Sequence, residues 1–77
     1  MAKYIVYRGG SSNAYNSLGV IGTVYAVGEK SAKKEAGSLF PCYNGQYLFV
    51  KLASKASKRD NEWADEKEYF TQNCLYN

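Results

Sequence analysis

The sequence predicts an α+β domain, in which a three-stranded antiparallel sheet in ββαβ order has one helix on one face and a second helix at the C-terminus. Two β-rich segments, 3–7 and 19–27, precede an alanine-spaced segment, and an alternating segment, 46–53, follows it. A chain of 77 residues suffices for one small core. We therefore expect a single domain, with a ββαβ body over 1–56 and an acidic helical segment over 57–77.

The first two strands are predicted from β-branched and aromatic residues. KYIVY over 3–7 is followed by the connection RGGSSNAYNSLG over 8–19 and then by GVIGTVYAV over 19–27. Gly22 inside the second segment indicates a bulge or a close backbone approach. The connection has twelve residues, whereas a hairpin loop usually has about two to five. Its length makes it a candidate functional loop.

The segment after the second strand has the spacing of a short amphipathic helix. Gly28 can act as N-cap, and Glu29 places a carboxylate in the first turn, where the helix dipole favours it. Pro41 ends the helix, because its ring cannot continue the backbone ladder. The apolar stripe consists of Ala32, Ala36, Leu39 and Phe40.

Alternation along the strands divides their side chains between two faces of the sheet. The face expected to pack on the first helix carries Val24, Ala26, Leu48, Val50 and Leu52, and the opposite face carries Tyr25, Tyr47, Phe49 and Lys51. The first strand has apolar residues on both faces, Tyr4 and Val6 on one and Ile5 and Tyr7 on the other. This second face is aromatic, so another segment must cover it or a partner must bind it.

The C-terminal segment is predicted to be a helix that begins at about residue 57 or 60 and ends at about residue 72. Trp63, Phe70 and Cys74 lie at i, i+7 and i+11, which fits a helical face. The stretch EYFTQNCLY has nearly equal strand propensity, so a strand remains the alternative. A helix that folds back would bury Trp63, Tyr69 or Phe70 against the aromatic face, and a domain this small needs that area.

Charge is divided unevenly along the chain. Residues 1–59 contain nine Lys and Arg against two Glu, and residues 60–77 contain one Lys against five acidic residues. A basic body with an aromatic sheet face fits an RNA- or DNA-binding domain, in which Lys51, Lys55, Lys58 and Arg59 would hold phosphates. The acidic tail and the lack of an RNP-like run argue against it. Nucleic acid is therefore the alternative partner.

Enzymatic activity is not expected. The chain has no His, and neither Cys42 nor Cys74 has an activating partner nearby in the sequence. The glycines of the connection do not match a phosphate-binding loop. We expect no cofactor and no metal, reduced cysteines with a disulfide as the alternative, and a soluble cytoplasmic protein without membrane contact.

Protein recognition is the function that we expect. Tyr, Ser, Gly and Asn are typical of recognition loops, and the connection has this composition. The candidate contact residues are Arg8, Tyr15 and Asn16 in the connection, with Tyr25, Tyr47 and Lys51 on an adjoining surface. The partner would be a larger protein or nucleoprotein complex, and self-association is left open.

The segment TVYAVGEKSAKKEAGSLFP resembles a pattern in small ββαβ proteins. Val24, Tyr25 and Ala26 end the strand, Gly28 caps the helix, Ala32 and Ala36 pack, and Phe40 with Pro41 ends it. Short phage-encoded inhibitors of bacterial RNA polymerase are similar in this layout and size, as are other small phage proteins that act against host defence systems. The resemblance implies a stoichiometric inhibitor of a host nucleoprotein complex, either RNA polymerase or a defence nuclease. Lys30, Lys33 and Lys34 depart from the acidic strip of the polymerase inhibitors, so their contact residues are not carried over.

Overall fold

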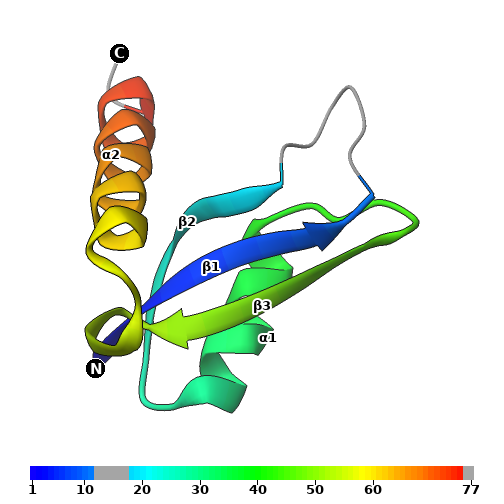
Figure 1. The fold of residues 1–77 in the computed structure, drawn as a ribbon, viewed down its shortest axis with the longest axis horizontal. Coiled ribbons are helices and arrows are strands. Elements are labelled where there is room, and N and C mark those ends of the chain that lie inside the picture. The colour runs from blue at the N-terminus through cyan, green and yellow to red at the C-terminus, as the bar shows by residue number, and fades with distance from the viewer. Residues whose placement is uncertain (12–17, 76–77) are drawn as a thin grey trace.

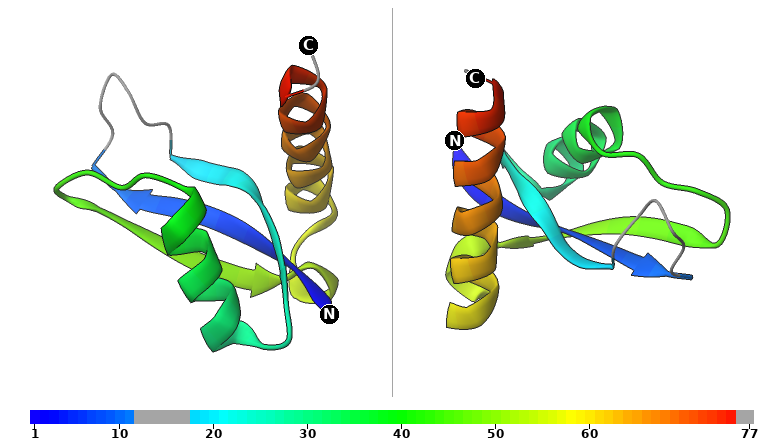
Figure 2. Two further views of the ribbon diagram at one scale, coloured as in Figure 1. Left: turned by 180° about the vertical axis from the view of Figure 1, so that it is seen from behind. Right: turned by 90° about the horizontal axis from the view of Figure 1, so that it is seen from above.

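Three antiparallel strands form a sheet in the order β2-β1-β3, and a helix lies on each face (Figures 1 and 2). The computed structural model describes residues 1–11 and 18–75, with side chains up to Lys67. The strands are β1 (Ala2–Gly10), β2 (Gly19–Ala26) and β3 (Gln46–Leu52). The helices are α1 (Glu29–Leu39) and α2 (Lys58–Leu75), and a short 3-10 turn (Ala53–Lys55) precedes α2. The predicted small α+β fold is confirmed, and the C-terminal segment is a helix.

Strand β1 is longer than predicted, and the connection after it is correspondingly shorter. Gly9 and Gly10 have poor strand propensity, yet they pair with Tyr47 and Gln46 of β3. Ser11 N–H also donates to the Gly45 carbonyl at 2.8 Å. These partners are distant in sequence, so the local pattern could not indicate the extension. Arg8 to Gly10 therefore belong to the sheet.

The α1 face of the sheet is a closed apolar core. Helix α1 lies across it and buries Ala32 and Ala36 completely. The sheet residues of this core are Tyr4, Val6, Val24, Ala26 and Val50, with Ile21, Leu48, Leu52 and Phe40 packed beside them. The two alanines let the helix approach the strands closely, because each adds little volume between the backbones.

One member of the predicted apolar stripe does not join this core. Leu39 is 59% exposed, because it is the last residue of α1 and the chain turns away after it. Phe40 instead turns back onto β2, where its ring packs on Gly22. A Cβ at Gly22 would lie 2.5 Å from Phe40 Cζ, so any other residue at this position would force the ring to move. The pairing of β1 with β2 shifts its register between Val6 and Tyr7, beside this contact. A shift of this kind is a β-bulge, which the glycine at position 22 indicated.

The opposite, α2 face is covered over part of its area. Helix α2 packs mainly on β2 and reaches β1, where Ala64 is buried against Ile5 and Tyr7. Of the three aromatic residues named as alternatives for burial there, Trp63 is not buried, since it is 47% exposed. The small Ala64 side chain lies beneath the helix axis, and Trp63 projects to its flank. Tyr69 and Phe70 lie outside the residues whose side chains are described.

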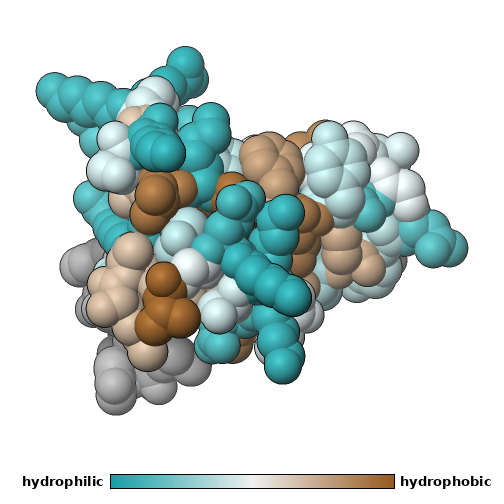
Figure 3. All heavy atoms as spheres, turned by 90° about the horizontal axis from the view of Figure 1, so that it is seen from below, coloured by the Kyte–Doolittle hydropathy of each residue, from teal (hydrophilic) through white to brown (hydrophobic). Residues whose placement is uncertain are grey.

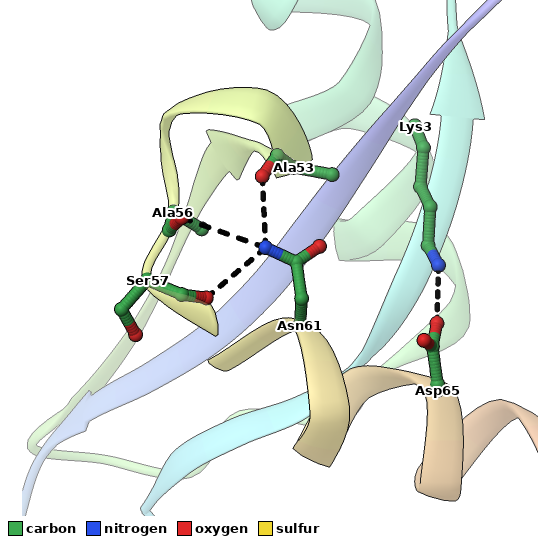
Figure 4. Close-up of polar contacts among 6 residues, drawn as sticks. All are labelled: Lys3, Ala53, Ala56, Ser57, Asn61 and Asp65. Atoms are coloured by element: carbon green, nitrogen blue, oxygen red, sulfur yellow. Dashed lines mark hydrogen bonds and ion pairs between the residues drawn. The ribbon is translucent and has the colours of Figure 1, made fainter. Parts of the chain in front are cut away.

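The side chains of Asn61 and Asp65 make polar contacts that help to hold α2 in place (Figure 4). Asn61 Nδ2 donates to the Ala53 carbonyl at 2.9 Å and to the Ser57 carbonyl at 3.0 Å, so it ties the 3-10 turn to the first turn of the helix. One turn later, Lys3 of β1 pairs with Asp65. In Figure 1 the C-terminal turns of α2 extend beyond β2.

Within residues 1–11 and 18–75, no helix is long and apolar enough to cross a membrane.

Candidate interaction surface

Three aromatic side chains, Tyr7, Phe49 and Tyr47, lead from beneath α2 onto the part of this face that the helix leaves uncovered, and we call them the aromatic row. Tyr7 and Phe49 are cross-strand neighbours, and their rings stack with centroids 4.8 Å apart and planes within 2°. Tyr47 follows at 6.0 Å from Phe49, tilted by 32°. Exposure increases along the row from the buried Tyr7 to 37% for Phe49 and 58% for Tyr47. The row therefore passes from the core to the solvent.

Glycine at position 9 positions the outer end of the row. Gly9 lies opposite Tyr47 in the register of β1 and β3. A Cβ built on Gly9 would lie 2.6 Å from Tyr47 Cζ, so the ring occupies the space that a side chain would take. The ring is thus held against the sheet, which keeps an exposed aromatic group in one place at little entropic cost.

Two polar groups flank the buried end of the row. Tyr7 Oη donates to Asp60 Oδ2 at 2.8 Å, which links β1 to the first turn of α2. Burial, together with this hydrogen bond and the negative charge of Asp60, raises the pKa of Tyr7 to about 12. Lys51 Nζ lies over the Tyr7 ring, 5.6 Å from its centroid, in the geometry of a cation–π contact.

A cleft of about 310 Å³ opens between α2 and the start of β2. The strand side consists of Leu18, Gly19 and Val20, and the helix side of Arg59, Asp60, Trp63 and Lys67. Asp60 belongs both to this cleft and to the hydrogen bond with Tyr7, and Val20 is the cross-strand neighbour of Tyr7. The cleft and the aromatic row therefore adjoin at Tyr7, and together they form one surface, which we call the α2-side surface.

The structure separates the predicted contact residues. Arg8 is only 6% exposed, and its Nη2 donates to the Pro41 carbonyl at 2.7 Å, so it fastens the segment after α1 to the sheet and offers little area to a partner. Tyr25 is half-exposed on β2, but it pairs with Lys3 near the start of β1, whereas Tyr47 pairs with Gly9 near its end. Tyr15 and Asn16 lie outside the described residues.

Of the predicted residues, Tyr47 and Lys51 lie on the α2-side surface. The basic residues of the nucleic-acid alternative lie in more than one place. Lys51, which lies over Tyr7, also lines a recess with Lys55, Glu29 and Tyr4. Arg59 lines the cleft. Lys58 is exposed at the start of α2.

Sequence reasoning missed three residues of this surface. Phe49 was placed on the correct face but not among the contact residues, and its alternation with Tyr47 was the available signal. Trp63 was named as one of three alternatives for burial and not as a contact residue. Leu18, which is 40% exposed at the cleft, had no signal beyond its position at the end of the connection.

Comparison of this chain with protein-family models, with curated proteins and with solved structures found no match. Among the side chains that the structure describes, Cys42 is an exposed free thiol, and no group of three or more His, Cys, Asp or Glu residues is arranged to hold a metal ion. The α2-side surface is therefore interpreted from its own geometry.

Proposed function

We propose that this protein is a non-enzymatic binding protein that acts stoichiometrically on a partner protein through the α2-side surface. The observation that supports the proposal is the exposure of Phe49 and Tyr47 on a sheet face that α2 covers only in part. A domain of this size needs its aromatic area for its core. Aromatic groups held rigidly at the surface and rimmed by charged residues are typical of protein interaction sites.

The cleft supplies the second part of such a site. Trp63 and Leu18 are exposed apolar groups, and Arg59 and Lys67 flank them. Trp, Tyr and Arg are the residue types that most often carry binding energy in protein interfaces. A partner that fits would insert an apolar group into the cleft and place acidic groups against its basic rim.

The ring geometry favours a protein partner over nucleic acid. A sheet that binds RNA through aromatic residues stacks two or three bases on exposed ring faces. Here Tyr7 is buried, and one face of Phe49 is covered by Tyr7. Tyr47 is then the ring in the row best placed to accept a base. The more specific role, inhibition of a host nucleoprotein complex such as RNA polymerase or a defence nuclease, rests on the pattern Val24 to Pro41 and stays a prediction.

An affinity experiment with matched variants tests the proposal. The full wild-type chain and the variants Phe49→Ala, Tyr47→Ala and Trp63→Ala are immobilised separately. A nuclease-treated lysate of the cell that produces the protein is passed over each of them. Leu39→Ala is the control, because Leu39 is as exposed as Tyr47 but lies on α1, on the other side of the sheet.

We expect a protein recovered in about equal molar amount by the wild type and by Leu39→Ala. Each aromatic variant should bind it at least about tenfold more weakly, since truncation of an interface hot spot costs about 2 kcal/mol or more. Equal recovery by all variants would show that the α2-side surface is not the contact. A partner that is recovered from an untreated lysate but not from the nuclease-treated one would favour the nucleic-acid alternative.

A further inference from the structure

The two edges of the sheet differ in how they are protected from pairing with another strand. At the β2 edge the ladder is broken by a bulge, because Val6 pairs with Gly22 and Tyr7 with Val20, which leaves Ile21 as the extra residue. Helix α2 also packs on β2. Bulges and covering elements are devices by which proteins block edge-to-edge association.

The β3 edge has no bulge, and the helix that packs on β3 is α1, on one face of the sheet. Its register with β1 continues without a break through seven pairs, from Gln46 to Leu52. Within the described residues, β1 is the one strand that pairs with β3. The strand QYLFVKL contains no Pro and no Gly, and its one charged residue, Lys51, lies near its end. Figure 3, which views the molecule from this side, shows hydrophobic side chains exposed among hydrophilic ones. A regular, apolar edge of this kind is a template for another strand.

The sequence of β3 is complementary to itself. In an antiparallel pair of two copies centred on Phe49, Phe49 faces Phe49 of the other copy, and Tyr47 faces Lys51 in both halves. On the α1 face the same register places Leu48 opposite Val50. Aromatic pairs, Lys–Tyr pairs and aliphatic pairs then lie opposite one another, and no two like charges meet across the two-fold axis.

We propose that the protein forms a symmetric dimer by antiparallel pairing of the two β3 edges in this register, which joins the two sheets into one of six strands. The pairing adds Phe49 and Tyr7 of the second copy to those of the first, so the aromatic row continues across the two-fold axis. Because the contact is made at the strand edge, the α2 face of the joined sheet stays open. The dimer does not rest on the proposed function, since the isolated protein forms it without a partner.

A charge-reversal cycle tests both the dimer and its register. Sedimentation equilibrium of the full chain, from micromolar to millimolar concentration, gives the dimer dissociation constant for the wild type and for Tyr47→Lys. In a dimer of Tyr47→Lys, position 47 of each copy faces Lys51 of the other, so two pairs of like charges meet. We therefore expect the dissociation constant to rise at least about tenfold. Adding Lys51→Glu to that variant places opposite charges in the same two positions. The dissociation constant should then return to within about threefold of the wild-type value.

Lys34→Glu is the matched control, because it reverses a charge on exposed α1 and should leave the dissociation constant unchanged. Circular dichroism of each variant reports whether the fold is kept; positions 47 and 51 are both exposed, so the variants should fold. A wild-type protein that stays monomeric over the whole range would overturn the proposal. So would a dimer that Tyr47→Lys leaves intact, or one that the double variant fails to restore, because either result would place the contact elsewhere.

Discussion

The two faces of one sheet have different roles in this protein. The α1 face is closed: Ala32 and Ala36 lie on Val6, Val24 and their neighbours, and this cluster is almost wholly buried. The α2 face begins as core at Ile5 and ends as exposed aromatic surface at Tyr47. A small domain can therefore use one face entirely for stability and divide the other between stability and contact.

The difference follows from where each helix crosses the sheet. Helix α1 contacts all three strands, whereas α2 packs mainly on β2 and to a lesser extent on β1. In Figure 2 the two helices lie on opposite sides of the sheet and in different directions. Strand β3, which lies farthest in the sheet from β2, carries the exposed part of the aromatic row and the edge without a bulge.

The variant with the largest expected effect, Ile5→Ala, tests whether the covered part of the α2 face belongs to the core. Ile5 is fully buried there, as Val6 is on the α1 face. Ile5→Ala should lower the free energy of unfolding by about 2–5 kcal/mol, because it removes buried methylene groups and leaves a cavity. Urea denaturation measures the change, with Val6→Ala as the counterpart on the other face. A loss below about 1 kcal/mol for Ile5→Ala alone would show that α2 contributes little to the core.

The next prediction concerns the attachment of α2 to the sheet. Asn61→Ala removes the donor that the Ala53 and Ser57 carbonyls share, and should cost about 1–3 kcal/mol of stability. Glu62→Ala, at an exposed position in the same turn, should change stability by less than about 0.5 kcal/mol. Thermal unfolding of both variants checks this difference. Equal effects would mean that the 3-10 turn does not position the helix.

Alkaline pH should weaken the link between the aromatic row and α2. The pKa of Tyr7 is about 12 in the folded protein against 10.0 for an ordinary tyrosine, so the folded state holds this proton more tightly than the unfolded state. The resulting stability is present below pH 10 and is lost as the pH rises from about 10 to about 12. The wild type should lose up to about 2 kcal/mol more than Tyr7→Phe over that window.

Tyr7→Phe is the informative comparison because it keeps the ring stack with Phe49 and removes only the ionisable hydroxyl. All other ionisable groups are the same in both proteins, so their effects cancel in the difference. Chemical denaturation at a series of pH values gives the two curves. Parallel curves would contradict the Tyr7–Asp60 link as the cause.

The smallest expected effect is that of the surface ion pairs on the two sides of the sheet. A double-mutant cycle on Lys3 and Asp65, which join β1 to α2, should give a coupling below about 1 kcal/mol, since Asp65 is largely exposed. The pair Glu29 and Lys33 within α1, with atoms 3.8 Å apart, should give about 0.3 kcal/mol or less. Both couplings should decrease as salt is added. A coupling of several kcal/mol at Lys3 would make electrostatics, rather than Ala64, the main attachment of α2.

Local chemistry made much of this fold predictable. Gly28 and Pro41 bound α1 because capping geometry and the proline ring act on adjacent residues. The alternation of Tyr47, Phe49 and Lys51 assigned them to one face, since the strand period is set by backbone geometry alone. The candidate site was predictable to the same extent: its face and two of its residues, Tyr47 and Lys51.

The remaining features depend on contacts between segments far apart in the chain. Strand β1 includes Gly9 because β3 pairs with it, and Arg8 is buried because the Pro41 carbonyl meets it. Ala64 rather than Trp63 lies beneath α2 because the helix axis crosses β1 and β2 at that residue. The sequence by itself determined the elements and the faces of their side chains, through local sterics and periodicity. Only the tertiary structure decided which part of the aromatic face stays open, because that depends on where α2 packs.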